Sequence, residues 1–491
     1  MSHRQRLVVA LIATSAILLV LFSSSRAGEV LKLVWSYSSP ASTGTSPVVD
    51  PFLVDLQQRT FHFFWDTANP KNGLVPDRFP SPSYSSVAAV GFALTAYPVG
   101  IERGYVTRPQ ARKRVLTTLR FFRNAPQGHA VKGMAGYKGF YYHFLDMKTG
   151  QRYDDSELST VDTAIFLAGA LFCQSYFQGD HPEEVEIRRL VDELYRRVDW
   201  QWAQPHAPAI SLGWSPEEGF LEYDWRGYNE AMLVYLLALG SPTHPVGPEA
   251  WAEWTSTYDT ASWRTAFGQE FLNFAPLFGH QYTHVWIDFR KLQDAYMRRR
   301  GMDYFENTRR AVYAQRAYAI ANPRDCKHYS ATIWGLTASD GPADTKVGHG
   351  PTARVYRTYA ARGAGGSDAY DDCTLAPTAV VGSLPFAPEV VLPAVLDMHK
   401  QFGEYIYSKY GFLDAFNTNF DATVPVTQGR CVKGFGWVDD DYLGIDQGAI
   451  FAMIENYRSA MIWGVMRKNP YVRNGLTRAG FDGGWLTASA Q

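Results

Sequence analysis

Apolar residues recur every three or four positions through most of the chain between residues 52 and 466, a spacing that places them on one face of a helix. Ten segments carry this pattern clearly: Phe52–Asp66, Val87–Arg103, Arg108–Arg123, Ser159–Phe177, Pro182–Trp202, Tyr228–Leu239, Tyr282–Arg299, Tyr304–Ala321, Phe386–Lys409 and Tyr442–Met466. Two weaker segments bring the expected helices to twelve: Trp263–Phe274 and Ala376–Leu384. Segments with the two-residue alternation of strands are few.

Amphipathic segments stand beside more apolar ones in this series, and long loops rich in Gly, Trp and Tyr separate the pairs. Twelve helices in a single domain predict an all-α fold, an (α/α)6 toroid with six inner helices surrounded by six outer ones. The long loops are then expected to gather at one rim, because loops on a rigid scaffold commonly carry function.

The N-terminal residues are typical of a targeting segment. Two arginines precede an apolar run from Leu7 to Phe22, and small residues before Gly28 mark a cleavage site. The run is shorter than the roughly twenty residues that span a bilayer, so a secreted or periplasmic protein is expected, with an uncleaved N-terminal anchor as the alternative. The expected parts are a signal peptide at 1–27, a linker at 28–51, the helical domain at 52–467 and a C-terminal tail at 468–491.

Composition and charge exclude several classes of protein and of binding partner. The chain is 46% hydrophobic and 19% charged, which excludes a disordered or fibrous protein. A formal net charge of −1 gives no bulk attraction for nucleic acid or anionic lipid. Aromatic residues make up 15% of the chain, and such rings suit a cleft that binds a polysaccharide or oligosaccharide. We expect a monomer with no nucleic-acid partner.

Four cysteines, in an exported chain, form up to two disulfides, and three pairings of Cys173, Cys326, Cys373 and Cys431 are open. None of them belongs to a C-x-x-C pair, so neither a zinc site nor a redox motif is indicated. The sequence therefore predicts no metal and no cofactor.

Acidic residues stand at the beginnings of three apolar helices: Asp162, Glu230 and Asp446. Each has a structural explanation, because Ser159 and Asp162 make a capping box and the helix dipole favours an acid in the first turn. The loop before each of them is rich in Gly or aromatic residues. At one rim of a toroid the three would converge, and convergence is what a glycosidase with two carboxylates needs.

Five motifs in order resemble a known family: residues 139–146 (GFYYHFLD), 157–164 (ELSTVDTA), 219–231 (GFLEYDWRGYNEA), 280–290 (HQYTHVWIDFR) and 444–448 (GIDQG). Together they resemble the glycoamylase-like domain family, and within it the bacterial β-1,2-glucanases of glycoside hydrolase family 144. The resemblance implies an (α/α)6 barrel and endo-hydrolysis of β-1,2-glucan with inversion at the anomeric carbon. Relatives with exo or transglycosylating activity remain alternatives.

An inverting hydrolase needs one protonated carboxyl group as acid and one ionised carboxylate as base. We expect Glu230 to be the acid and Asp446 the base, with Asp162 and Glu157 as further catalytic candidates. A helix N-terminus lowers the pKa of a carboxyl group, so the acid needs burial or a like charge to raise it. The candidates for substrate binding are Tyr142, His143, Asp224, Trp225, Tyr228, His280, His284, Asp288, Arg290, Trp437 and Gln447.

Some candidates have competing interpretations. His280 and His284 stand four residues apart, which suits a metal pair, a sugar contact or two structural histidines. Asp288 and Arg290 either bind hydroxyl groups or form an ordinary ion pair. We expect the rings of Trp225 and Trp437 to face the cleft. At the level of the whole protein, a polysaccharide lyase or a non-catalytic glycan-binding protein are the alternatives to a hydrolase.

Overall fold

The computed structural model describes residues 49–348, 353–365, 369–420 and 423–487. The expected signal peptide and nearly all of the expected linker lie outside these residues. Within them, no helix is both long enough and apolar enough to cross a membrane.

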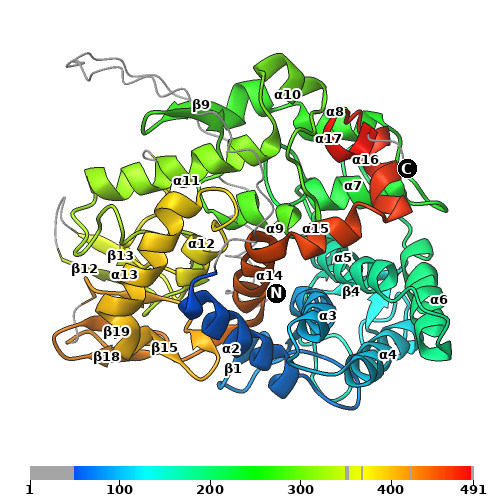
Figure 1. The fold of residues 1–491 in the computed structure, drawn as a ribbon, viewed down its shortest axis with the longest axis horizontal. Coiled ribbons are helices and arrows are strands. Elements are labelled where there is room, and N and C mark those ends of the chain that lie inside the picture. Colours follow the sequence, from blue (N-terminus) through cyan, green and yellow to red (C-terminus); the bar gives the residue numbers. More distant parts are fainter. Residues whose placement is uncertain (1–48, 349–352, 366–368, 421–422, 488–491) are drawn as a thin grey trace.

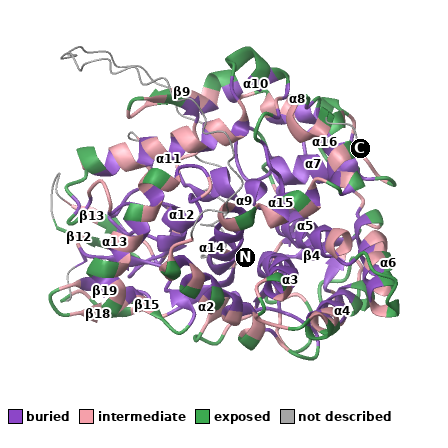
Figure 2. Ribbon diagram, in the orientation of Figure 1, coloured by how far each residue is buried: buried purple, intermediate pink, exposed green. Residues whose placement is uncertain are grey.

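One set of helices is buried on almost every side. Most of their residues are apolar or small, which favours burial of the whole circumference, and most polar side chains of α9 and α14 are buried as well. These helices are α3 (Val87–Glu102), α5 (Thr160–Tyr176), α7 (Met232–Gly240), α9 (Phe278–Trp286), α12 (Pro377–Val381) and α14 (Gly444–Ser459). They lie toward the middle of the molecule in Figure 1 and are almost uniformly buried in Figure 2.

A second set is amphipathic and alternates with the first along the chain. It comprises α2 (Pro51–Thr67), α4 (Arg108–Asn124), α6 (Pro182–Arg196), α8 (Glu249–Thr255), α11 (Tyr304–Ala321) and α13 (Pro388–Ile406). Most of these lie at the periphery, with exposed residues on their outer faces (Figure 2). The described fold is therefore mostly helical, with buried and half-buried helices in alternation.

The buried helices approach one another closely because glycine stands where they cross. A Cβ on Gly169 of α5 would lie 2.0 Å from the backbone oxygen of Gly91 in α3. A Cβ on Gly448 of α14 would lie 2.1 Å from the ring of Phe92, also in α3. Helices α5, α3 and α14 thus form one tightly packed row, and each of α5 and α14 carries a candidate carboxylate in its first turn.

Four of the expected helices need correction. Trp263–Phe274 is a hairpin of β9 (Trp263–Ala266) and β10 (Gln269–Leu272), because Phe267 and Gly268 take positive φ and turn the chain. Tyr282–Arg299 divides into α9 and α10 (Ala295–Arg300), the latter capped by Asp294. Tyr442–Met466 divides at Ala460, which has a φ of 54°, into α14 and α15 (Met461–Met466). Pro182–Trp202 ends earlier, as α6.

The expected C-terminal tail is partly folded. It contains α16 (Pro470–Arg478), which packs against α7, and α17 (Gly484–Thr487). Phe481 is buried in the same hydrophobic cluster that begins at Leu53. Residues up to at least 481 therefore belong to the helical core.

Short strands occupy the loops. One antiparallel sheet has the order β3-β4-β6-β7-β8 and contains β3 (Gly136–Tyr137), β4 (Phe140–Tyr142), β6 (Leu158–Ser159), β7 (Gly213–Ser215) and β8 (Gly219–Phe220). A second has the order β17-β19-β18 and contains β17 (Phe416–Asn417), β18 (Arg430–Val432) and β19 (Gly436–Val438). Two-stranded pairs are β1 (Arg78–Phe79) with β20 (Tyr442–Leu443), β2 (Ser85–Ser86) with β5 (Phe144–Leu145), β11 (Ala338–Asp340) with β14 (Tyr359–Ala361), β12 (Thr345–Val347) with β13 (Arg354–Tyr356), and β15 (Tyr407–Ser408) with β16 (Gly411–Phe412).

A disulfide and a buried ion pair stabilise the long loops that follow α11. A disulfide joins Cys326 to Cys373, so the structure supplies one of the pairings that the sequence left open. Arg362 forms a fully buried ion pair with Asp372, with Nε 2.7 Å from Oδ1. The disulfide links the residues just after α11 to the residues that follow β14, and the ion pair joins two residues of the segment after β14.

Candidate active site

The first acidic group of the site lies at the start of α5. The hydroxyl of Ser159 accepts a hydrogen bond from the Asp162 backbone N–H at 3.1 Å and lies 2.5 Å from Oδ2 of Asp162. Asp162 is buried, and this burial raises its pKa although the neighbouring His143 lowers it. The cap that the sequence predicted is therefore present, and it orients a buried carboxyl group.

His143 lies between two of the predicted acids. Its Nδ1 is 2.8 Å from Oε1 of Glu157, and its Nε2 is 3.5 Å from Oδ1 of Asp162. Burial alone would lower the pKa of His143, but Asp162, Glu157 and Asp77 together raise it to about 10. His143 is consequently an imidazolium at neutral pH, bracketed by carboxylates on both ring nitrogens.

Glu230 lies in the turn before α7, and its side chain is only 5% exposed. Its Oε2 receives no hydrogen bond from the described residues. Burial, and then the charge of Asp162, raise its pKa to about 7. Burial thus outweighs the helix N-terminus, and Glu230 has the pKa that a general acid needs.

Asp446 occupies the first turn of α14 and is 2% exposed. Burial raises its pKa to about 6, and the charges of Asp340, Asp77 and Asp439 act in the same direction, while a hydrogen bond with Asp414 lowers it. Burial therefore raises the pKa of both Glu230 and Asp446 above the ordinary range of a carboxyl group.

Several elements bring these two groups to one place. Tyr282 of α9 is close enough to both Asp446 and Glu230 for each charge to raise its pKa. Thr283, the next residue, donates to the backbone oxygen of Glu230 at 3.4 Å. Asp77 links the His143 side to the Asp446 side, since it influences the pKa of both. Asp162, Glu230 and Asp446 are therefore close enough to act on one another or on common neighbours, although Glu230 lies in the turn before its helix and not in the first turn.

The sequence analysis missed five residues around Asp446: Asp77, Arg78, Asp340, Asp414 and Asp439. Pairing of β1 with β20 and a 2.7 Å hydrogen bond from Gly444 to the oxygen of Asp77 bring residues 77 and 78 to the start of α14. Asp439 stood in a visible acidic run, but Asp77 and Asp414 are single residues in loops, and Arg78 and Asp340 lie in the short strands β1 and β11. Only the three-dimensional pairing identifies them.

Three of these acids have the arrangement of a cation site. Asp340, Asp414 and Asp439 each offer one carboxylate oxygen, and the three atoms lie within 4.8 Å of one another. Arg78 already neutralises one member, with Nη1 2.5 Å from Oδ2 of Asp340. A second such group, Cys326 with Asp371 and Cys373, has both sulfur atoms committed to the disulfide.

Among the predicted substrate-binding residues, Tyr142, Asp224 and Gln447 contact other side chains or backbone of the protein. Tyr142 is buried beneath the guanidinium of Arg152, 4.8 Å from its ring centroid. Asp224 pairs with Arg226 at 3.2 Å. Gln447 donates to the backbone oxygen of Phe412 at 2.9 Å, and its Oε1 receives no hydrogen bond from the described residues.

The two tryptophans that we expected to face the cleft are buried in the structure. Trp225 is 3% exposed and Trp437 is fully buried. Their indole N–H groups donate to Oγ1 of Thr160 at 2.9 Å and to the oxygen of Gln428 at 2.7 Å. Tyr228 is likewise buried and stacks on Tyr304. The indole N–H groups of both tryptophans are therefore satisfied by protein, and Trp437 packs in a small hydrophobic cluster with Tyr356, Ala415 and Phe420.

His280, His284, Asp288 and Arg290 also need correction. Burial lowers the pKa of both histidines to about 3, so each is neutral. Their Nε2 atoms contact different partners, the oxygen of Phe274 at 3.1 Å and Oγ1 of Thr308 at 3.2 Å, which is a structural and not a metal-binding arrangement. Asp288 forms a two-pronged ion pair with Arg290, at 2.8 and 2.7 Å, and also contacts Arg467. The ordinary ion pair is therefore the correct interpretation.

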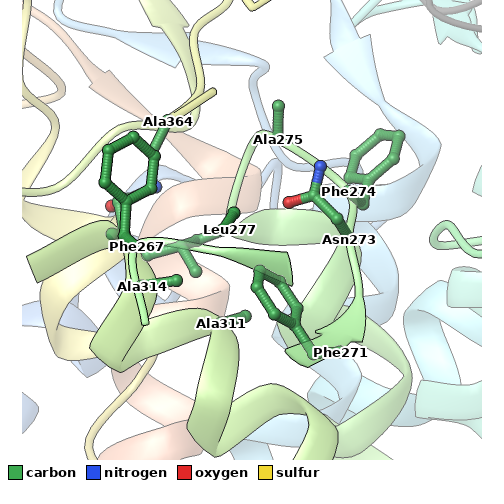
Figure 3. A pocket seen from close by; sticks show the side chains of 11 residues that line it. Phe267, Phe271, Asn273, Phe274, Ala275, Leu277, Ala311, Ala314 and Ala364 are labelled. Atoms are coloured by element: carbon green, nitrogen blue, oxygen red, sulfur yellow. The ribbon is translucent and has the colours of Figure 1, made fainter. Parts of the chain in front are cut away.

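A small pocket between the β9–β10 hairpin and α11 is distinct from this site (Figure 3). Phenylalanine, leucine and alanine line most of it, with Asn273 and Gln315 as the polar residues. Its volume of about 10 Å³ has room for a single water molecule. It contains no carboxyl group, so the chemistry of the chain is expected at Glu230 and Asp446.

Comparison with known proteins agrees with this geometry. The profile of the Glycoamylase family, described as "Putative glucoamylase", matches residues 222–470, just over half of the chain and both Glu230 and Asp446. A solved protein of Bacteroides fragilis, described in the same words, is 30% identical with a TM-score of 0.75, covering 91% of this chain and 100% of that one. The endo-β-1,2-glucanase of Chitinophaga pinensis, solved with sophorotriose and glucose, is 28% identical with a TM-score of 0.74, covering 88% and 98%.

A curated relative adds a second activity. The exo β-1,2-glucooligosaccharide sophorohydrolase (non-reducing end) of Parabacteroides distasonis is 27% identical, over 90% of this chain and 59% of the relative. The chain thus spans about three-fifths of the length of that protein. The family profile matches the half of the chain that carries Glu230 and Asp446. A relative of 30% identity is matched over its full length. The chain therefore belongs to the Glycoamylase family.

Proposed function

We propose that the chain is a glycoside hydrolase that cleaves β-1,2-linked glucan within the chain and inverts the anomeric carbon. The observation that carries this proposal is the pair of buried carboxyl groups, Glu230 and Asp446, whose pKa values of about 7 and about 6 suit an acid and a base. We also propose that the alternating helices form an (α/α)6 toroid with this pair at one rim. The likeness to the β-1,2-glucanase of Chitinophaga pinensis supports the substrate and the toroid.

In the proposed reaction, one proton is donated on one side of the glycosidic bond and one proton is accepted on the other side. Glu230 gives its proton to the leaving glycosidic oxygen as the bond from that oxygen to the anomeric carbon breaks. Asp446 takes a proton from a water molecule whose oxygen attacks the anomeric carbon from the opposite face. Glu230 is left ionised and Asp446 protonated, and exchange with solvent restores both groups.

His143 and its two acids have a supporting part in this scheme. The imidazolium places a positive charge beside Asp162, whose own negative charge raises the pKa of Glu230. Asp162 and Glu157 are therefore held by His143 as fixed carboxylates, suited to accept hydrogen bonds from sugar hydroxyls. We assign the acid and base to Glu230 and Asp446, and not to these two residues, because neither Glu230 nor Asp446 is neutralised by a cation.

Exo action is the second candidate, because the curated relative from Parabacteroides distasonis releases its product from the non-reducing end. Endo action is favoured because this chain covers 98% of the endo-acting relative but 59% of the exo-acting one. Product sizes separate the two: endo cleavage gives a ladder of oligosaccharides early, whereas exo cleavage gives a single disaccharide from the start.

The test is incubation of the purified chain with linear β-1,2-glucan, beside β-1,3-, β-1,4- and α-1,4-glucans. We expect new reducing ends from the β-1,2 polymer alone and α-anomeric products by NMR at early times. Glu230→Gln and Asp446→Asn should each lower kcat by roughly 100-fold or more, whereas Glu222→Gln, the same change at an exposed neighbour, is the control. Turnover of none of the polymers, or full activity in both site variants, would refute the proposal.

We further propose that the protein acts outside the cytoplasm, on the strength of residues 1–27 alone. Expression of the full chain, followed by N-terminal sequencing of the exported form, tests this. A mature N-terminus near Gly28 is expected, and retention of the intact segment in the membrane fraction would favour the anchor instead.

A further inference from the structure

Three aromatic rings form a row that begins at His143. Phe144 stacks on the imidazole, with ring centroids 4.0 Å apart and planes inclined by 24°. The ring of Tyr84 lies 4.2 Å from that of Phe144, and the ring of Tyr153 lies 4.7 Å from that of Tyr84, both in tilted contacts. The row therefore starts at the imidazole that bridges two of the acids and ends at Tyr153.

The row leads from buried groups to solvent. Asp162, which His143 contacts, is 6% exposed, and His143, Phe144 and Tyr84 are half-buried. Tyr153 is 41% exposed. A large aromatic side chain that stays in water beside a group of buried carboxyl groups is unfavourable for the isolated protein, and such a surface commonly marks a ligand site.

Tyr84 connects this row with the acids around Asp446. The backbone N–H of Asp77 donates to the oxygen of Tyr84 at 2.8 Å, and the next residue, Arg78, pairs with Asp340. Burial raises the pKa of Tyr84, and the charges of Asp77 and Asp340 raise it further, so its phenol is close to both acids. The row is thus continuous with the proposed active site on two sides.

The loop that carries Tyr153 is held by other groups. The N–H of Tyr153 donates to the oxygen of Phe144 at 3.0 Å, and the N–H of Arg152 donates to the oxygen of Met134 at 2.7 Å. Nε of Arg152 donates to the oxygen of Ser156 at 2.6 Å. The backbone and Arg152 therefore set the course of this loop, and the exposed ring of Tyr153 is available to a ligand.

We propose that Tyr84, Phe144 and Tyr153 form an aromatic subsite, in which the exposed ring of Tyr153 stacks on a glucosyl unit of the substrate beyond the two units that flank the cleaved bond. This inference rests on the proposed function. A glucose ring carries C–H groups on its faces and hydroxyl groups on its rim, so an aromatic face binds it while the hydroxyl groups remain in water. The ligand is an uncharged sugar, because the exposed end of the row consists of a phenol ring.

The competing explanation is that Tyr153 only packs the surface of its loop. The two explanations differ in what depends on the ring. A packing role predicts that loss of the ring lowers Tm and alters the binding of every ligand alike. A subsite predicts an unchanged Tm and a loss of affinity that is confined to ligands long enough to reach Tyr153.

The experiment measures binding by isothermal titration calorimetry in the Glu230→Gln background, with the β-1,2-linked glucose disaccharide and hexasaccharide. Tyr153→Ala should raise the Kd of the hexasaccharide about tenfold and change that of the disaccharide by less than about twofold. Tyr153→Phe keeps the ring and should bind both ligands as the parent does. Ile320→Ala, which truncates an exposed apolar side chain of α11, is the control, and the Tm of each variant should equal that of the parent.

Four outcomes would overturn the proposal. They are an unchanged Kd of the hexasaccharide in Tyr153→Ala, equal losses in the Ala and Phe variants, equal losses for both ligands, and no binding of the hexasaccharide by the parent. Failure of the proposed function is seen separately, because calorimetry needs no turnover. A wild type that cleaves none of the glucans, beside a parent that shows the expected dependence on ligand length and on the ring, would refute hydrolysis and retain the subsite.

Discussion

The stability of the Glu230→Gln variant relative to the wild type should increase as the pH rises from acidic to alkaline. The pKa of Glu230 is raised from 4.5 to about 7, mainly by burial. Between these two values the folded state binds a proton that the unfolded state has released, so the free energy of unfolding falls as the pH rises. Glutamine carries no such proton, so this part of the pH dependence disappears in the variant.

The magnitude follows from the shift. Each pKa unit corresponds to 1.36 kcal/mol, so the wild type should lose about 3 kcal/mol between pH 4 and pH 8 that Glu230→Gln does not lose. For a chain of 491 residues, the unfolding entropy near the midpoint is about 1 kcal/mol per kelvin, so the difference in Tm should change by roughly 3 °C.

The assay is differential scanning calorimetry of both proteins at pH 4.5 and pH 8, in one ionic strength. Glu222→Gln makes the same chemical change on an exposed side chain, and its Tm difference from the wild type should stay constant with pH. If the Tm difference for Glu230→Gln is also constant between the two pH values, Glu230 titrates normally. The reasoning that makes it the general acid would then fail.

Three further predictions concern the pH optimum, the disulfide and the close contact of two helices at Gly169. The pKa values of about 7 and about 6 at the proposed acid and base predict a bell-shaped kcat/KM with its maximum near pH 6.5, falling about tenfold per pH unit beyond each limb, as steady-state kinetics would show. Replacement of both Cys326 and Cys373 by Ala, which opens a link across 47 residues, should cost about 4 kcal/mol and lower the calorimetric Tm by roughly 4 °C. Gly169→Ala forces a Cβ to within 2.0 Å of the facing helix and should cost roughly 1–3 kcal/mol of unfolding free energy, whereas Gly464→Ala, with no atom within 4 Å, should not.

The helices could be predicted where burial requires a long run of apolar residues in the sequence. Helices α3 and α5 are buried on every side, so their apolar residues form near-continuous runs that are easy to find. The hairpin at Trp263–Leu272 was mistaken for a helix because its apolar residues do not alternate, and the deciding feature is the turn at Phe267 and Gly268. Nothing in the local sequence predicts the break at Ala460, because alanine favours the helix interior. Its positive φ is imposed by tertiary packing.

The candidate site could be predicted as far as helix starts are visible. Glu230 and Asp446 precede long apolar runs, so their place at a helix beginning follows from the local sequence. Asp77 and Asp414 have no such marker. They reach Asp446 through the pairing of β1 with β20 and the backbone bond of residue 414 to residue 441, contacts between segments far apart in the chain.

The different surroundings of the two carboxyl groups explain why helix position alone does not assign their roles. Both stand near helix beginnings, where the dipole favours the charged form. Each of the two groups has one oxygen without a donor among the described residues, and burial is the main cause that raises the pKa of both. Asp446 has Asp414 beside it, and that hydrogen bond offsets part of the same burial. Residues of distant loops therefore act on the pKa of the proposed base, and the roles of the two carboxyl groups depend on these surroundings and not on helix position.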